Sequence, residues 1–162
     1  MSQADAVQDT RVMIDAALTA ANVMMRVAAR SVLEVEDRVT TPQLRVLMLI
    51  ALNGLQSLGS VAAELGVHAS NATRTCEKLV QAGLIARSDD PADRRFIQLE
   101  LTSDGAGLVE QVLRHRREAM ADVFAAMSPG EQSAVTASLE IFARAAGDEP
   151  SRDGRFTFTL EP

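Results

Sequence analysis

Apolar residues in the first third of the chain recur three or four positions apart, the spacing of one face of a helix. From about Asp5 to Val35 they predict one long amphipathic helix, rich in alanine and methionine. A second helix is predicted to begin at Thr41-Pro42, with the threonine as its cap and the proline at its first position, and to end at Asn53-Gly54. The apolar positions of the first helix are Ile14, Ala17, Leu18, Ala21, Met24, Met25 and Ala28.

The middle of the chain predicts two shorter helices joined by a tight turn, which together form a helix-turn-helix. The first follows Ser57, whose hydroxyl can cap it, and stops at Gly66. The second runs from about His68 to Gly83, and its apolar face comprises Ala72, Cys76, Leu79 and Val80. The other face carries small polar groups and cations of the kind that bind the major groove of DNA, namely Ser70, Asn71, Thr73, Arg74 and Lys78.

After the second of these helices the pattern changes to alternation, which predicts a β-hairpin. Its strands are Leu84–Ala86 and Phe96–Leu101, and the second places Ile97, Leu99 and Leu101 on one face. The tip between them carries Arg94 and Arg95. Arginines held out on a hairpin suit a narrow minor groove. In a simpler interpretation, Asp90 and Asp93 neutralise the arginines in a solvated turn.

The C-terminal third predicts two more helices. Ser103 caps one that runs to about Met127, and Ser128-Pro129-Gly130-Glu131 is a capping box that opens another. Together with the first helix, they have more apolar face than the hairpin and the helix-turn-helix can cover. In the tail, Phe156, Phe158 and Leu160 alternate with threonines as in a strand, and the role of this tail stays open.

Short motifs span the helix-turn-helix and the hairpin. They are Leu65-Gly66-Val67, Thr73-Arg74, Leu79-Val80-Gln81-Ala82-Gly83-Leu84-Ile85, Arg87, Asp90-Pro91-Ala92-Asp93-Arg94-Arg95 and Leu99-Glu100-Leu101-Thr102-Ser103-Asp104-Gly105. On these residues the chain resembles the MarR family of winged-helix transcriptional regulators, over roughly residues 10 to 146. The resemblance implies a mainly α fold with a small β-hairpin wing. A dimerisation helix (1–36), a winged helix-turn-helix that binds DNA (37–102) and further dimerisation helices (103–146) would precede a tail of unknown role (147–162).

The resemblance also implies partners and a mode of action. A homodimer would bind an inverted repeat in double-stranded DNA, with Arg74 in the major groove and Arg94 and Arg95 in the flanking minor groove. Such regulators are most often repressors that release DNA when a small ligand, commonly aromatic or phenolic, enters a pocket between the dimer helices and the winged helix. Side chains that would line such a pocket, unless they are plain core, are Met24, Met25, Met48 and His115.

Composition and charge limit the classes of protein to which this chain can belong. A chain of 162 residues, 47% of them apolar, can bury one core, so we expect a single domain extended by long helices. The net charge of -6 does not exclude DNA binding, because affinity depends on the local surface that meets the phosphates. No apolar run approaches membrane-spanning length and the N-terminal segment is acidic, so we expect a cytoplasmic protein that contacts no membrane.

Several alternatives concern single residues. One cysteine and two widely separated histidines make a poor metal set, and no cofactor is expected. Cys76 is either a small core residue, as its apolar neighbours indicate, or an oxidant sensor. An enzyme is not expected, because a hydrolase built on Cys76 would need an adjacent imidazole and a third orienting group.

Two further points stay open. His68 stands where the family usually has a serine or a similar cap. Because an imidazole caps poorly, we expect His68 to contact a phosphate or merely to be tolerated. A winged helix that has lost DNA binding could serve as a protein-interaction module, and Arg74, Arg94 and Arg95 argue against that function.

Overall fold

The computed structural model of the protein describes residues 3–89 and 97–147. Within them, the helices are α1 (Gln3–Leu33), α2 (Thr41–Asn53), α3 (Leu58–Glu64), α4 (Ala69–Gln81), α5 (Ser103–Ala125) and α6 (Pro129–Ala145), and the strands are β1 (Gln56–Ser57), β2 (Ile85–Asp89) and β3 (Ile97–Leu101). The expected fold class, mainly α with a small β-hairpin wing, is confirmed. The strand predicted at Phe156–Leu160 and the tip of the wing lie outside the described residues.

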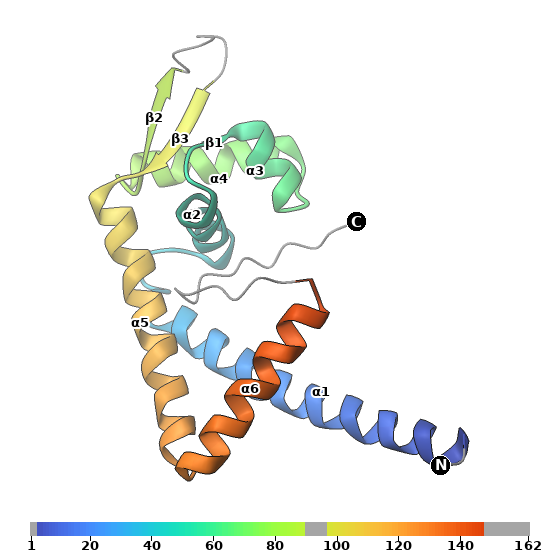
Figure 1. Ribbon diagram of the computed structural model, residues 1–162. Helices are drawn as coiled ribbons and strands as arrows, with labels where there is room; N and C mark the ends of the chain where they lie inside the picture. The colour runs from blue at the N-terminus through green and yellow to red at the C-terminus, as the bar shows by residue number, and fades with distance from the viewer. Residues whose placement is uncertain (1–2, 90–96, 148–162) are drawn as a thin grey trace.

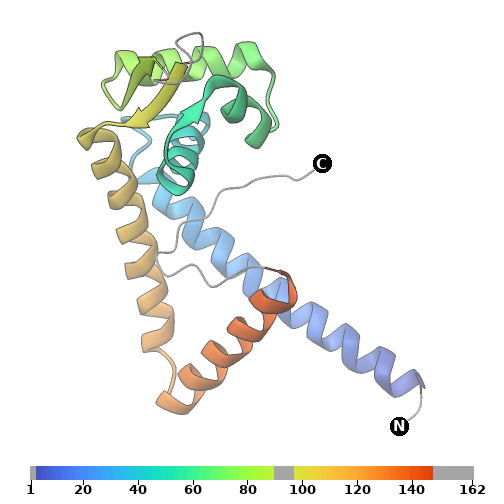
Figure 2. The same cartoon turned by 45° about the horizontal axis from the view of Figure 1, so that its top comes forward.

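The helices and strands gather into a head and two arms (Figure 1). The head comprises α2, α3, α4 and the three strands, and α5 leads away from it. The arms are α1, which packs against α5, and α6, which starts at the far end of α5. Figure 2 shows the same arrangement from another side, with the N-terminal end of α1 projecting away from the rest of the chain.

The core of the molecule lies in the head and under the first turns of α5. It brings together fully buried side chains from α2, α4, β2, β3 and α5, so each of these elements contributes to one apolar core. This packing fixes the head as one unit and ties α5 to it. The largest of these side chains are Leu47, Leu49, Leu79, Ile85, Leu99, Leu108 and Leu113.

The sheet contains one strand that the sequence pattern did not predict. Its order is β1-β3-β2, antiparallel throughout, with Ile85 opposite Leu101 in the hairpin and Gln56 opposite Leu99 on the other edge. β1 is two residues long, so it has no detectable alternation of its own. It forms because the residues that lead into α3 pass beside β3.

Two helix starts differ from the prediction by one residue. Thr40, not Thr41, caps α2: its backbone N–H donates to Gln43 Oε1 at 2.8 Å, and Pro42 is the second helical residue. Thr102, not Ser103, caps α5, because its Oγ1 accepts from the Gly105 N–H at 3.1 Å. The capping box of α6 is confirmed. Ser128 donates its backbone N–H to Glu131 Oε2 at 2.8 Å, and its hydroxyl lowers the pKa of that carboxylate.

The end of α4 and the start of α5 meet at a close contact, here named the joint (Gly83, Leu84, Thr102 and Gly105). Thr102 donates its N–H to the carbonyl of Leu84 at 3.2 Å and its hydroxyl to the carbonyl of Gly83 at 2.7 Å. Gly105 is buried, and a Cβ at this position would overlap the carbonyl oxygen of Leu84. The joint therefore connects the chain leaving α4 rigidly to α5.

The packing of α1 against α5 includes a buried polar contact. Arg116 donates from Nε to Ser31 Oγ at 3.0 Å, and Ser31 donates to the carbonyl of Ala28 at 2.7 Å. Burial lowers the pKa of Arg116. Because both side chains are buried, this contact fixes where α1 crosses α5.

Most of α1 is apolar and uncovered. Within the segment Gln8–Leu33, an 18-residue window has a mean hydropathy of 1.4, and 6% of that window is buried. By length and composition it passes the test for a membrane-spanning helix, which corrects the expectation that no apolar run approaches that length. The core helices of soluble proteins pass the same test, so the observation establishes an uncovered apolar surface and nothing about a membrane.

Candidate nucleic-acid interface

The turn between α3 and α4 has the geometry of a helix-turn-helix. The Ser57 hydroxyl accepts from the Ser60 N–H at 3.0 Å and starts α3, as predicted. At the other end, the Val67 N–H donates to the carbonyl of Ala62 at 3.0 Å while Gly66 has a φ of +61°. A positive φ is accessible to glycine without steric cost, so Gly66 allows the chain to reverse here.

His68 is the N-cap of α4. Its Nδ1 accepts from the Ser70 N–H at 3.3 Å and lies 2.9 Å from Ser70 Oγ. The expectation that His68 caps poorly is therefore wrong, since the imidazole does what a serine hydroxyl does at this position. Because Nδ1 accepts, the neutral ring carries its proton on Nε2. The contact of His68 with a phosphate stays a prediction.

The side chains of α4 divide into a buried face and an exposed face. Ala72, Cys76 and Leu79 are at most 2% exposed, as the sequence predicted. The hydroxyl of Thr73, which is half-buried, donates to the carbonyl of Ala69 at 2.9 Å and is left to act as an acceptor. The predicted site residues of this helix share its solvent side and are Ser70, Asn71, Thr73, Arg74 and Lys78.

Arg74 lies beside a hollow between α4 and the first turn of α2. The cavity has a volume of about 290 Å³, and Arg45 of α2 borders it from the other side. Arg45 donates from Nη2 to the carbonyl of Leu65 at 3.3 Å, so its head group is held in place. Within the described part of the chain Arg74 makes no ion pair, and the alternative that it braces the fold through Glu77 finds no support there.

Sequence reasoning missed Glu77 as a member of this face. It is exposed, and it lies one helical turn after Thr73 and three residues after Arg74. A carboxylate repels phosphates and can accept a hydrogen bond from N4 of cytosine. The sequence signal for Glu77 was its spacing from Thr73 and Arg74, which places it on the same face of the helix. Glu77 therefore places an acceptor of opposite charge on the cationic face of α4.

Cys76 is buried beneath this face. Burial raises the pKa of the thiol to about 11, with a smaller opposing effect from Arg87. A thiol with such a pKa is protonated at neutral pH and is a poor nucleophile. The structure therefore favours the core interpretation of Cys76 over the oxidant sensor.

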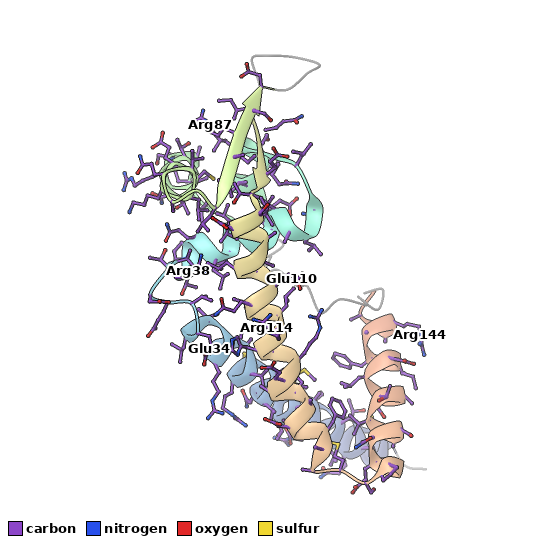
Figure 3. All side chains as sticks on the ribbon, turned by 90° about the vertical axis from the view of Figure 1, so that its left-hand side faces the viewer. Glu34, Arg38, Arg87, Glu110, Arg114 and Arg144 are labelled. Atoms are coloured by element: carbon purple, nitrogen blue, oxygen red, sulfur yellow. The ribbon has the colours of Figure 1, made fainter. Side chains whose placement is uncertain are left out.

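The wing contributes one cation that the predicted site left out. Arg87 of β2 is exposed, and Figure 3 shows it on the side of the wing that faces α4. It was visible in the sequence as part of the hairpin motif, but its direction depends on how the sheet packs. The predicted site residues Arg94 and Arg95 lie outside the described residues.

The side chains that the sequence suggested as the lining of a ligand pocket do not line the cavities named below. Met48 is core, whereas Met24 and Met25 are exposed on α1. His115 Nδ1 lies 3.8 Å from a carboxylate oxygen of Glu118. Cavities at α2 and α4, at α1 and α5, and at α2, β3 and α5 are lined by other residues.

Comparison with known proteins agrees with this geometry. The family model described as the MarR family matches residues 39–97, which include α2, the helix-turn-helix and β2. The crystal structure of RV1404 from Mycobacterium tuberculosis aligns with 88% of this chain and 97% of its own, at 34% identity and a TM-score of 0.74. This chain belongs to the MarR family. It is thus a transcriptional regulator, and members of this family are not enzymes.

Two other similar proteins bear on function. The HTH-type transcriptional repressor MdtR of Bacillus subtilis is 37% identical over 83 residues, which are 51% of this chain and 54% of MdtR. BpsR of Bordetella bronchiseptica, whose DNA binding is regulated by 6-hydroxynicotinic acid, is 25% identical with a TM-score of 0.51, covering 80% of this chain and 98% of BpsR. The chain spans about half to two thirds of the length of the first curated relatives that it matches.

Proposed function

We propose that this MarR family protein is a repressor that reads double-stranded DNA with the exposed face of α4. The observation that carries the proposal is the division of α4 into a buried apolar face and an exposed face of small polar groups and cations. Asn71, Thr73 and Arg74 reach base edges in the major groove, where the Thr73 hydroxyl accepts from a base amino group, and Ser70 and Lys78 bind the backbone. The similarity to the repressor MdtR supports repression rather than activation of transcription.

The wing supplies a second set of contacts. We propose that Arg94 and Arg95 enter the flanking minor groove and that Arg87 binds a phosphate between the two grooves. The support is the position of Arg87, which is exposed on β2 and faces α4 (Figure 3). Arginine is well suited to this role because the narrow minor groove has an enhanced negative potential.

The protein acts as a homodimer in this proposal, with residues 37–102 as the DNA-binding domain and the segments 1–36 and 103–146 as dimerisation helices. The large apolar side chains of both arms are uncovered in the single chain, and a second copy would cover them. A two-fold axis places two heads on one DNA molecule, so the operator is an inverted repeat. The exposed large apolar residues of the two arms are Val12, Met13, Ile14, Leu18, Met24, Met25, Leu33, Ile141 and Phe142.

The regulator releases its operator when a small ligand binds. The regulation of BpsR by 6-hydroxynicotinic acid supports a response of this kind and makes a small aromatic or phenolic compound the first class to test. The protein has its site of action on DNA, and we place it in the cytoplasm.

The test is the binding of parent and Arg74→Ala to an inverted-repeat duplex from upstream of the gene and to a scrambled duplex, each at two salt concentrations. We expect a loss of about 1–3 kcal/mol on the cognate duplex and a smaller loss on the scrambled one. Arg114→Ala, which removes an exposed arginine from α5, is the control and should bind as the parent does. Equal binding by Arg74→Ala would remove it from the interface, and a parent that binds no duplex would favour the protein-interaction module.

A further inference from the structure

The hydrogen bond between Arg116 and Ser31 lies where α1 and α5 stop packing against each other. Its two side chains come from positions 85 residues apart, and Arg116 Nε is 3.0 Å from Ser31 Oγ. Among the residues of α1 whose side chains the structure describes, Ala28 is the first to be buried, and Arg116 is the last buried residue of α5. The contact therefore closes the buried part of the interface between the two helices (Figure 1).

Past this contact, towards the N-terminus of α1 and the C-terminus of α5, the helices leave space between them. A hollow of about 350 Å³ lies there, lined by Val23, Val27 and Arg30 of α1 and by Ala119 and Val123 of α5, among others. Each of these five residues is half-buried or exposed, so close packing in this part of the described chain does not fix how the helices cross. The angle between α1 and α5 depends on the contact itself and on residues nearer the head.

The direction of the contact is set by what each partner can donate. Ser31 gives its only hydroxyl proton to the carbonyl of Ala28 at 2.7 Å, so its oxygen accepts from Arg116. Arg116 offers a rigid planar donor, and burial lowers its pKa because the charge is removed from water. Apolar side chains of similar volume would stabilise the crossing as well or better. The pair is therefore better explained by the direction that it imposes than by its contribution to stability.

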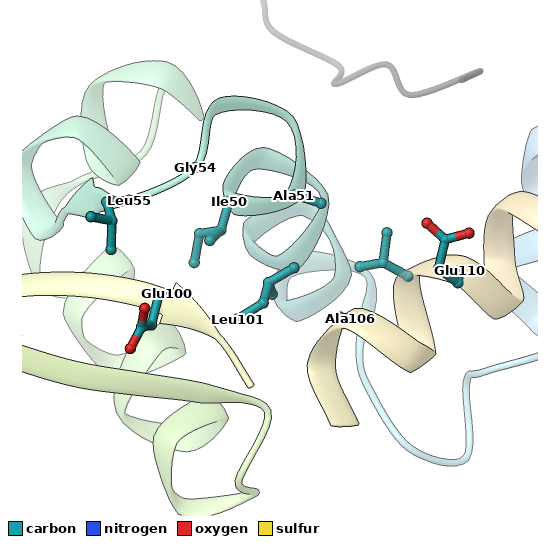
Figure 4. A pocket seen from close by; sticks show the side chains of 9 residues that line it. Ile50, Ala51, Gly54, Leu55, Glu100, Leu101, Ala106 and Glu110 are labelled. Carbon is teal, nitrogen blue, oxygen red and sulfur yellow. The ribbon is translucent and has the colours of Figure 1, made fainter. Parts of the chain in front are cut away.

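Both helices are fixed to the head on the other side of the contact. The start of α5 is held by the joint and by α2 and β3, whose Ile50 and Leu101 line one pocket with Ala106 of α5 (Figure 4). The chain that follows α1 is anchored by Val35 and Val39, which are buried in the core of the head. A change in the crossing angle would therefore turn the outer part of α1 relative to the head.

The length of α1 amplifies a small change of angle. Met13 lies about 27 Å from Ser31 along the helix, at about 1.5 Å per residue, so a turn of about 10° would move it by about 5 Å. In the proposed dimer the arms are held by the partner copy, so the same turn moves the head instead. Because adjacent base pairs are about 3.4 Å apart, a movement of this size misplaces α4 by about one base pair.

We propose that Arg116 and Ser31 are positioning residues for DNA binding. Their hydrogen bond holds the angle at which α1 crosses α5, and this angle sets the separation of the two heads of the dimer. The separation in turn selects the spacing of the half-sites in the operator. The part that concerns DNA rests on the proposed function, whereas the angle is a property of the single chain.

The angle is tested within one chain by pulsed EPR, with spin labels on cysteines that replace Asp15 of α1 and Glu64 of α3. Both positions are exposed, and labelled chains are diluted with unlabelled ones so that distances within a chain are measured. We expect a narrow distance distribution in the parent and a width at least about twofold larger in Ser31→Ala with Arg116→Met. Cys76 is buried, so the parent without the new cysteines should take up no label.

The double variant separates orientation from stability. It removes both partners at once and leaves neither of them buried without the other, so its free energy of unfolding should equal or exceed that of the parent. Ser133→Ala with Arg114→Met removes a helix hydroxyl and an arginine from exposed positions and should keep the narrow distribution. If the double variant does not fold, Ser31→Ala alone removes one oxygen atom and allows the same measurement. A folded variant with the distribution of the parent would overturn the proposal.

The effect on DNA recognition is tested with duplexes that carry the two half-sites of the operator at different spacings. We expect the parent to bind its preferred spacing at least about tenfold more tightly than one changed by two base pairs, and the double variant to show less than about threefold preference. A duplex with one half-site should bind both proteins equally, because α4 is untouched. An unchanged preference in the double variant would refute the DNA part. If the parent binds no duplex, the proposed function fails, while the EPR distances still decide the angle.

Discussion

The head and the arms of the molecule differ in where their apolar side chains lie. In the head, Leu47, Leu79 and Leu99 are 0% exposed and belong to one core that forms within the chain. In the arms, Met13 of α1 and Phe142 of α6 are each 63% exposed, and no residue of α6 is buried. Both regions nevertheless show the same helical spacing of apolar residues in the sequence.

This difference shows that periodicity predicts an apolar face but not what covers it. The head has enough helices and strands, packed at different orientations, to enclose a core around α2. Each arm is a single helix: α1 packs mainly against α5, and α6 follows α5 in the chain. Much of the apolar face of each arm is therefore uncovered. An uncovered apolar surface of this kind is typical of an interface between chains. The head therefore closes its core within one chain, whereas the arms leave apolar surface that a second copy would cover in the proposed homodimer.

The largest effect should come from charging the arms. Replacing Ile141 and Phe142 by aspartate places two carboxylates in the proposed interface, and desolvating them would cost more than the remaining contacts supply. We expect the dimer to dissociate at micromolar concentration, measured by analytical ultracentrifugation, with the helical content of the head retained. Thr136→Asp, which is exposed on the opposite side of α6, is the control. A dimer of unchanged mass would show that α6 lies outside the interface.

The joint should respond to a single methyl group. Gly105→Ala forces a Cβ against the carbonyl of Leu84, and we expect a loss of about 1–3 kcal/mol in the free energy of unfolding. Gly107→Ala, two residues later in the same helix, meets nothing within 4 Å and should stabilise by about 0.5–1 kcal/mol, because alanine favours helix. Denaturant unfolding of the two variants measures the difference. Opposite signs support the joint, whereas two stabilising substitutions would contradict it.

The core of the head should show a pH dependence that comes from Cys76. Its pKa is about 11 in the folded protein and is raised from 9.0, so the folded state holds its proton longer than the unfolded state does. The stabilisation is complete below pH 9 and is lost as the pH rises towards 11, by on the order of 1–2 kcal/mol. Denaturant unfolding of parent and Cys76→Ala over this range measures it. The variant should lack this part of the decline, and parallel curves would show that the thiol is not buried.

Mild peroxide tests the same burial at neutral pH. Duplex binding by the parent should be unchanged by the treatment, and Cys76→Ser should behave as the parent does, at a cost of about 1–2 kcal/mol in stability. Loss of binding in the parent alone would restore the oxidant-sensor interpretation.

The smallest effect concerns the cap of α4. His68→Ser keeps a cap acceptor and should change the free energy of unfolding by only a few tenths of a kcal/mol, whereas His68→Ala should cost about 1 kcal/mol. Because serine has no equivalent of the imidazole Nε2–H, duplex binding by His68→Ser then measures what that group contributes to DNA binding. Weaker binding at equal stability would assign a phosphate contact to His68, and unchanged binding would leave it with the cap alone.

Much of the head could be predicted because its signals are local. The cap at Ser57, the turn at Gly66 and the apolar face of α4 each depend on residues a few positions apart. The helix starts at Thr40 and Thr102 were missed by one residue, because threonines and serines stand side by side there and both can cap. The cap by His68 was missed because its ring must turn Nδ1 towards the Ser70 N–H, which the sequence does not state.

By itself, the sequence determined which segments form the helices and the two hairpin strands, which face of each is apolar and which residues of α4 face away from the core. These properties follow from backbone geometry and from hydrogen bonds within one or two turns. Only the tertiary structure decided the pairing of β1 with β3 and the contact of Gly105 with Leu84. These contacts join separate elements, and their geometry is set by the packing of the whole core.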